Sequence, residues 1–477
     1  GDTDITFKED VAMRFKAQNW QVLKVDLVAH PDDVDLLASA IKKAKKETKK
    51  PSIIICKTKI GYGTPLEGSH KCHGSPLGVE NLQKTKEHFG WTCAPFEVPD
   101  EVFAHTAKAC KRGAKKEREW KAMFAEYEKQ YPELAAAYKK AMSGEMVDLT
   151  KVNDLMKFEK PMATRQTSAT VLNKIAALVP NLMGGSADLA PSNLSDMKDT
   201  DTIHYGNFSA EDKSGRNMHF GIREHAMAAI TNGMELHGGL RCYCSTFFIF
   251  SDYCKHAMRL SALMNIPVIY ILTHDSIGVG EDGPTHEPVE QLIALRSIPN
   301  MKVYRPADGK ETAAAWISAL TGTAPTALVL TRQNLPQYAG SGLIALKGGY
   351  VLEDCDGTPD VLLIASGSEV EQCVGAKAKL AEEGIKARVV SMPCFEEFEK
   401  QSAEYKESVM PAAVKARVCV EAGSPYSWYK YAGDCGEIIG MSTFGASAPA
   451  AQLFKLFGFT VENVVEKAKA SLAKAGK

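Results

Sequence analysis

The sequence predicts an α/β protein with three successive domains, built from parallel or mixed sheets flanked by helices. Three observations predict this architecture. The chain has 477 residues, more than one hydrophobic core accommodates. Between residues 161 and 340, short apolar runs alternate with longer segments of helical periodicity, which is typical of a parallel sheet covered by helices. The same alternation returns on a smaller scale after residue 348.

The elements of the first block are predicted from local periodicity. A helix at 9–19 leads to a strand at 21–25, and a helix at 31–49 leads to a strand at 52–56. Residues 1–110 are therefore expected to form part of an α/β domain. Residues 111–160 are rich in lysine and glutamate with a helical pattern, so we interpret them as a helical connector.

The second and third blocks, residues 161–340 and 341–477, are each predicted to fold as an α/β domain. In the second, helices are predicted at 165–178, 223–237, 248–264, 289–298 and 309–320, and strands at 181–185, 241–245, 268–273, 302–304 and 326–331. In the third, strands are predicted at 361–365, 387–390 and 417–420, and helices at 370–382 and 450–457. Strands separated by helices favour parallel sheets.

The composition excludes several classes of function. With 45% hydrophobic and 24% charged residues, the chain has the balance of an ordinary globular protein. A net charge of −1 does not favour nucleic acid or a membrane as the main partner. No apolar run approaches the ~20 residues of a membrane span. The 12 cysteines are scattered, which is typical of a reducing compartment.

A glycine-rich loop is the most informative part of the sequence. The segment from His274 to His286 contains Asp282 and directly follows the apolar run 267–272. Two imidazoles and a carboxylate can bind and move protons near neutral pH, and open α/β sheets bind ligands in loops at the carboxyl ends of strands. The loop also contains G-x-G-x-x-G, but Pro284 follows the third glycine where a dinucleotide site needs a helix. We therefore favour a substrate-binding loop over a nicotinamide site.

Two further groups of residues leave alternatives open. Glu224 opens an apolar helical segment, where it either stabilises the helix terminus or serves as a buried acid that shares a proton with a ligand nitrogen. Phe247, Phe250 and Tyr253 recur at helical spacing, which usually indicates core packing but also suits a wall for a flat heteroaromatic ring.

Other candidate residues are weak when taken singly. Arg165, Ser192 and Arg332 lie near predicted strand ends and could hold a phosphate, although single arginines more often form surface ion pairs. His70 and His73 flank another glycine-rich loop, but third and fourth ligands at a useful spacing are missing from the sequence, which argues against a zinc site there.

Together these strings resemble transketolases over essentially the whole chain. The motifs that carry the resemblance are Ile60-Gly-Tyr-Gly with Gly68-Ser-His70, Ala163-Thr-Arg165, Gly184-Gly-Ser-Ala-Asp188-Leu with Pro191-Ser-Asn193, Gly221-Ile-Arg-Glu224-His, the aromatic positions 247, 250 and 253, Thr273-His274 through His286, and Thr331-Arg332-Gln-Asn-Leu-Pro. Found together and in this order, they are highly specific.

The resemblance implies an activity and a set of residue roles. Transketolases use thiamine diphosphate and a divalent metal, Mg²⁺ or Ca²⁺, to move a two-carbon ketol group from a ketose phosphate to an aldose phosphate. Glu224 would contact N1′ of the cofactor pyrimidine, and His70 and His286 would handle substrate protons. The remaining roles concern binding: Phe247, Phe250, Tyr253, Asp188 and His70 would face the cofactor, and His70, Arg165, Ser192, His274, Asp282, His286 and Arg332 would bind the substrate.

The resemblance also implies what lies outside the chain. The glycine-aspartate-glycine segment and asparagine that carry the diphosphate and metal in transketolases would precede Gly1, so no metal ligand is assigned here, and the sequence leaves open whether the chain used alone is active. We expect a cytoplasmic homodimer, with a plastid or another organelle left open. A related enzyme such as a deoxyxylulose-phosphate or dihydroxyacetone synthase, or a non-catalytic fragment, remains the alternative, as does carbon fixation in place of the pentose phosphate pathway.

Overall fold

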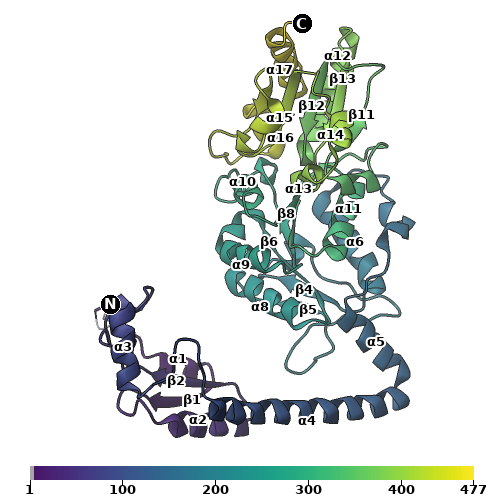
Figure 1. Cartoon of the computed structure of the whole chain (residues 1–477). Helices are drawn as coiled ribbons and strands as arrows, with labels where there is room; N and C mark the ends of the chain where they lie inside the picture. Colours follow the sequence, from purple (N-terminus) through teal and green to yellow (C-terminus); the bar gives the residue numbers. More distant parts are fainter. Residues whose placement is uncertain (1–4) are drawn as a thin grey trace. The chain divides into compact units, whose positions relative to one another are not determined.

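The computed structural model describes residues 5–477 and separates into two compact units, one ending at Glu126 and one comprising Tyr127–Lys477 (Figure 1). The first unit contains α1 (Val11–Ala17), β1 (Gln21–Asp26), α2 (Val34–Lys46), β2 (Ser52–Lys57), α3 (Val79–His88) and most of α4 (Asp100–Gln130), which crosses the boundary. β1 and β2 pair in parallel, with Gln21 opposite Ser52. Both strands and α1 and α2 were predicted to within a few residues.

The second unit begins with helical segments and a six-stranded sheet. Its elements are α5 (Pro132–Ser143), β3 (Met162–Ala163), α6 (Thr164–Leu178), β4 (Leu182–Ser186), α7 (Ala190–Asn193), β5 (Asn217–His219), α8 (Glu224–His237), β6 (Arg241–Phe247), α9 (Ser251–Met264), β7 (Ile269–Thr273), α10 (Gln291–Arg296), β8 (Lys302–Tyr304), α11 (Gly309–Thr321), β9 (Thr326–Leu330) and β10 (Asn334–Leu335). The strand order is β5-β4-β6-β7-β9-β8, and every pairing is parallel.

Helices cover both faces of this sheet (Figure 1). Along β7, Ile269 and Ile271 pack in the cluster that includes residues of α6 and α11. Tyr270 and Leu272 pack in the opposite cluster, with residues of α8 and α9. Successive side chains of a strand point to opposite faces, so a strand that is buried on both sides is apolar throughout. This explains why the run 267–272 lacks the alternation of a half-exposed strand.

A second sheet follows in the same unit. It contains β11 (Tyr350–Glu353), β12 (Val361–Ala365), β13 (Ala387–Ser391), β14 (Ala416–Val420) and β15 (Glu437–Ile439), with α12 (Val370–Glu382), α13 (Phe395–Glu399), α14 (Ala403–Val409), α15 (Tyr429–Ala432), α16 (Ala450–Leu456) and α17 (Val461–Lys474). The order is β11-β13-β12-β14-β15, with β11 antiparallel and the others parallel. The predicted α/β architecture with parallel and mixed sheets is therefore confirmed.

The sequence missed short strands at the sheet edges. β5, β11 and β15 have three or four residues each and offer little periodic pattern, although the equally short β8 was predicted. The predicted helix 248–264 starts one turn too early, because Phe248–Phe250 form a 3₁₀ turn and α9 begins only at Ser251.

Candidate active site

The candidate residues of the second unit follow the carboxyl ends of neighbouring strands. Phe247 ends β6, Asp188 follows β4, His274 follows β7 and Arg332 follows β9. From β4 the chain goes to β5 on one side, whereas β6 and β7 continue the sheet on the other. The carboxyl edge at such a reversal is where open α/β sheets bind ligands. The topology therefore brings the predicted residues to a single edge.

The aromatic side chains and the two loop histidines form one cluster. The rings of Phe247 and Phe250 are stacked with centroids 6.0 Å apart and planes within 5°, and Phe250 and Tyr253 continue the stack at 5.9 Å. The His274 ring lies 3.7 Å from Phe247, and His286 meets Phe250 edge-on at 5.6 Å. Tyr253 is 66% exposed, so core packing is the wrong interpretation for this position. In this segment Phe248 is fully buried, and Phe247 is also buried.

The loop that carries the histidines is buried up to Gly280 and then turns outward. His274 has φ = +63°, Gly280 has φ = +88° and Gly283 has φ = +78°. Glycine adopts such left-handed conformations without steric cost. Asp282 is exposed and His286 half-buried. The next α-helix, α10, begins only at Gln291, so Gly283 does not open a helix for a pyrophosphate. The nicotinamide interpretation is not supported.

Burial and charge keep His274 neutral. The side chain is 3% exposed, and its pKa falls to about 3 because burial disfavours the imidazolium, with Arg165, Arg332 and His286 adding repulsion. Its Nδ1 lies 2.8 Å from the hydroxyl oxygen of Thr273. His274 therefore offers hydrogen bonds as a neutral imidazole across the range in which histidines usually titrate.

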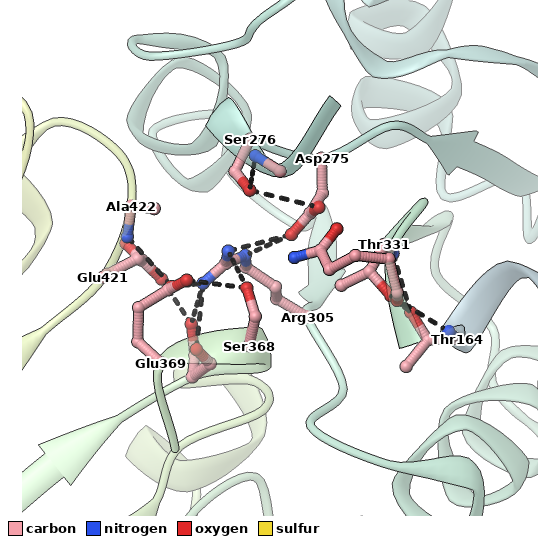
Figure 2. Close-up of polar contacts among 12 residues, drawn as sticks. Thr164, Asp275, Ser276, Arg305, Thr331, Ser368, Glu369, Glu421 and Ala422 are labelled. Carbon is pink, nitrogen blue, oxygen red and sulfur yellow. Dashed lines mark hydrogen bonds and ion pairs between the residues drawn. The ribbon is translucent and has the colours of Figure 1, made fainter. Parts of the chain in front are cut away.

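Two threonines place the arginines beside each other. The backbone N–H of Thr164 donates to Oγ1 of Thr331 at 3.0 Å, and the backbone N–H of Thr331 donates to Oγ1 of Thr164 at 2.7 Å (Figure 2). This pairing joins the start of α6 to the end of β9, so the next residues, Arg165 and Arg332, become neighbours. Burial and the charge of Arg332 lower the pKa of Arg165. Arg165 also donates to the carbonyl oxygen of Ser192 at 2.6 Å, so Ser192, the third residue predicted to bind phosphate, lies beside the two arginines.

Glu224 and Asp188 lie at the ends of regular elements. Glu224 is the first residue of α8 and is half-buried. Burial, followed by the negative charge of Glu224, raises the pKa of Cys254 in α9 to about 12, so Glu224 lies within electrostatic reach of the helix that carries Tyr253. Asp188 is exposed in a left-handed conformation with φ = +61°. His70 lies in the first unit, where it opens an exposed 3₁₀ turn, His70–Cys72.

A buried ion network behind the loop could not be recognised from the sequence. Arg305 is fully buried and donates through Nε to Asp275 at 2.9 Å and through Nη1 to Glu369 (Figure 2). Arg296 forms two hydrogen bonds of 2.8 Å with Glu421. Burial opposes ionisation of Glu421, but the guanidinium groups of Arg296 and Arg305 outweigh it and lower its pKa to about 2. The network joins residues 161–340 to residues 341–477.

A second missed residue is Glu287, the neighbour of His286. It is 1% exposed, and both carboxyl oxygens lack a well-formed hydrogen bond to residues 5–477. Burial raises its pKa to about 7, and the backbone N–H of Ala446 only partly offsets this. A Cβ on Gly445 would lie 1.7 Å from Oε2 of Glu287, so glycine is required for this close approach. The sequence signal was an acid between histidine and proline, which by itself does not indicate burial.

Within residues 5–477, three or more His, Cys, Asp or Glu side chains do not come together in a metal-binding arrangement. In the same residues, every helix is too short or too polar to cross a membrane.

Comparison with known families covers all three blocks of the chain. Residues 1–147 match the thiamine diphosphate binding domain of transketolase, residues 160–337 its pyrimidine binding domain, and residues 348–460 the transketolase-like C-terminal domain.

Similar proteins agree with these matches. The chain is 50% identical to the transketolase of Bacillus subtilis, over 99% of this chain and 71% of that protein. It is 47% identical to transketolase 1 of Escherichia coli, over 98% of this chain and 71% of the relative. A transketolase from Pichia stipitis solved with sedoheptulose 7-phosphate has a TM-score of 0.93 and 41% identity, over 100% of this chain and 70% of that one. The chain belongs to the transketolase family, and its activity is that of a transketolase, a transferase.

Proposed function

We propose that the chain transfers a two-carbon ketol group reversibly from a ketose phosphate, such as xylulose 5-phosphate, to an aldose phosphate, such as ribose 5-phosphate or erythrose 4-phosphate. The observation that carries this proposal is the meeting of an open aromatic stack with two histidines and two adjacent arginines. Solved Pichia stipitis transketolases with xylulose 5-phosphate and with sedoheptulose 7-phosphate support the substrate class.

Phe247, Phe250 and Tyr253 are proposed to bind the pyrimidine of thiamine diphosphate. The rings of Phe247 and Phe250 are parallel to within 5°, the ring of Tyr253 is tilted by 28° from Phe250, and Tyr253 remains exposed; this arrangement fits stacking on a flat ring. Glu224 is proposed to contact N1′ from the start of α8. When bound, the cofactor supplies an electron sink for the carbanion that forms beside the substrate carbonyl. Asp188 is proposed to support this pocket from the end of β4.

His286 and His70 are proposed to move the protons of substrate hydroxyl groups. His286 lies against the aromatic stack, where a half-buried imidazole can accept or donate a proton at the reacting hydroxyl. Asp282 and His274 are proposed to bind further hydroxyls and fix the sugar's orientation. The loop segment before Gly280 is buried and is proposed to exclude water from this side of the site.

The sugar phosphate is proposed to bind to Arg165, Arg332, Ser192 and His274. The charged neighbours of Arg165 and His274 are other cationic or basic groups, so an incoming phosphate would relieve repulsion as well as accept hydrogen bonds. This is opposite to Arg305, whose charge is already neutralised by carboxylates.

A homodimer is proposed, with α8 and α9 at the interface. Large apolar side chains remain exposed on these two helices and beside them: Ile222, Ile230, Leu236, Tyr253, Leu260, Leu263 and Met264. Apolar patches of this kind mark association surfaces. We expect a dimer by sedimentation at micromolar concentration, and a monomer would contradict the proposal.

We divide the chain into the remainder of the diphosphate-binding domain (1–110), the connector (111–160), the pyrimidine-binding domain (161–340) and the carboxyl-terminal domain (341–477). A divalent metal, Mg²⁺ or Ca²⁺, is proposed to accompany the cofactor. The cytoplasm and the pentose phosphate pathway are the proposed setting.

Calorimetric titration of thiamine diphosphate with Mg²⁺, followed by a transfer assay with xylulose 5-phosphate and ribose 5-phosphate, tests the proposal. We expect saturable binding and formation of a seven-carbon ketose phosphate. Binding without transfer would contradict the assigned reaction. Transfer that is equally fast with unphosphorylated ribose would contradict the phosphate site.

A further inference from the structure

A row of buried hydrogen bonds runs from β4 to His274. It starts at Ser186, whose hydroxyl donates to the carbonyl oxygen of Ser245 at 3.1 Å. The hydroxyl oxygen of Ser186 itself accepts from the backbone N–H of Leu189 at 3.2 Å and from Nδ2 of Asn193 at 3.0 Å. A hydroxyl has one proton and two lone pairs, so these three bonds use it completely. Asn193 must therefore direct its amide nitrogen toward Ser186 and its carbonyl oxygen away.

The donor and acceptor roles fixed at Ser186 also fix the hydrogen bonds that lead to His274. The hydroxyl of Thr273 donates to Oδ1 of Asn193 at 2.7 Å, so its proton is already used. Nδ1 of His274 lies 2.8 Å from the same hydroxyl oxygen, which can only accept there. The proton of the neutral imidazole is therefore on Nδ1. Asn193 is 1% exposed and Thr273 is fully buried, so water does not replace these partners.

The opposite nitrogen of His274 consequently carries a lone pair. Nε2 is at the end of the ring remote from Thr273, and the ring itself lies against Phe247. The charged or titratable groups that act on the ring are Arg165 on α6, Arg332 after β9, and His286 in the loop. All three oppose a positive charge on His274, and the neutral form is the resting state. A hydrogen-bond acceptor thus faces the site where a phosphate, also an acceptor, is proposed to bind.

We propose that the relay Ser186–Asn193–Thr273 makes sugar-phosphate binding at His274 take up one proton from solution. This rests on the proposed phosphate site. Two lone pairs cannot share a hydrogen bond, so a proton must lie between Nε2 and the phosphate oxygen. It comes from the buffer, and it either forms an N–H bond at Nε2 or remains as an O–H bond on a monoanionic phosphate. Both forms add one proton to the complex when the free phosphate is a dianion, above a pKa of about 6.

The proton count can be measured directly by calorimetry. Ribose 5-phosphate is titrated into the full chain at pH 8 in two buffers of different ionisation enthalpy, and the difference in apparent enthalpy gives the protons taken up. We expect a value close to one and an affinity that falls about tenfold per pH unit above pH 7. At pH 5 the free ligand already carries the proton, so uptake should approach zero. Unphosphorylated ribose should show no uptake at either pH.

Thr273→Val cuts the relay while keeping the shape of the side chain. His274 can then hold its proton on Nε2, so uptake at pH 8 should fall toward zero and the dependence of affinity on pH should flatten. Thr246→Val is the matched control, because Thr246 is equally buried and its hydroxyl has no hydrogen-bond partner among residues 5–477. The control should keep the wild-type uptake.

The wild-type protein decides the question even if Thr273→Val does not fold. Binding of ribose 5-phosphate with zero uptake at pH 8 would mean that the relay runs in the reverse direction, with the proton on Nε2, and would overturn this inference while leaving the transferase assignment intact. Absence of binding would overturn the phosphate site and this inference together. A transfer assay in which ribose 5-phosphate and unphosphorylated ribose react equally fast would identify a wrong phosphate site independently.

Discussion

Two consecutive residues, His274 and Asp275, face two differently built regions. His274 faces Arg165 and Arg332, which are charged neighbours of each other and leave their positive field available. Asp275 faces Arg305, whose guanidinium is buried and shared with Glu369. Arginine thus serves two purposes within one loop. An arginine that is paired with buried carboxylates connects two domains. An arginine that lies beside other cationic groups is suited to bind an anion.

The largest expected effect on the active site is that of a substitution at Glu224. We expect Glu224→Gln to reduce kcat by roughly 10²–10⁴-fold, the usual contribution of a positioned acid or base. The melting temperature should change little, because Glu224 is half-buried at a helix terminus. Steady-state kinetics and thermal unfolding measure both quantities. Glu281→Gln, the same change at an exposed position of the loop, is the control and should keep full activity. Unchanged kcat in Glu224→Gln would remove the assigned role.

The network side is tested at Arg305. Arg305→Met leaves Asp275 and Glu369 as buried charges without their partner, which typically costs about 3–5 kcal/mol in the free energy of unfolding. Urea unfolding measures this loss. Glu369→Gln is the graded comparison, because it removes one negative charge and keeps the side-chain shape, so its loss should be smaller. A loss below about 1 kcal/mol for Arg305→Met would show that the network does not hold the domains together.

Glu287 lies where the loop meets the carboxyl-terminal domain, and its effect should depend on pH. The folded pKa of Glu287, about 7, lies above the ordinary value of 4.5, so the fold favours the protonated carboxyl group. The free energy of unfolding is therefore unaffected by the charge below pH 4.5 and falls as pH rises from 4.5 toward 7, because the buried carboxyl group must then ionise. We therefore expect Glu287→Gln to be neutral near pH 4.5 and to stabilise the protein by about 2–3 kcal/mol at pH 8. Urea unfolding at the two pH values checks this. A stability difference independent of pH would contradict the assignment of Glu287 as a buried titrating acid.

The smallest expected effect concerns the phosphate. Arg332→Gln should raise KM for ribose 5-phosphate about 10–100-fold, the equivalent of roughly 1.5–3 kcal/mol for a hydrogen bond to a charged group. KM for unphosphorylated ribose should not change, and stability should be retained because Arg332 is exposed. Equal losses for the two sugars would move the phosphate away from this arginine.

Much of the molecule was determined by local sequence. The predicted strand 361–365 coincides with β12, and the predicted helices 165–178 and 309–320 differ from α6 and α11 by one residue at one end. Local periodicity reports which face of an element is buried, so element type and approximate bounds follow from it. The motifs likewise identified the family and the loop from His274 to His286, because they join chemically distinctive side chains over short distances in the sequence.

Tertiary structure alone decided which distant residues meet and which are buried. Thr164 and Thr331 are 167 residues apart, Asn193 and Thr273 are 80 apart, and Asp275 and Arg305 are 30 apart. The burial of Glu287 depends on the close approach of Gly445. Such contacts depend on the order of strands in the sheets and on domain packing, neither of which has a local period. The protonation of His274 follows from these contacts, so the sequence could nominate that residue but not its chemical state.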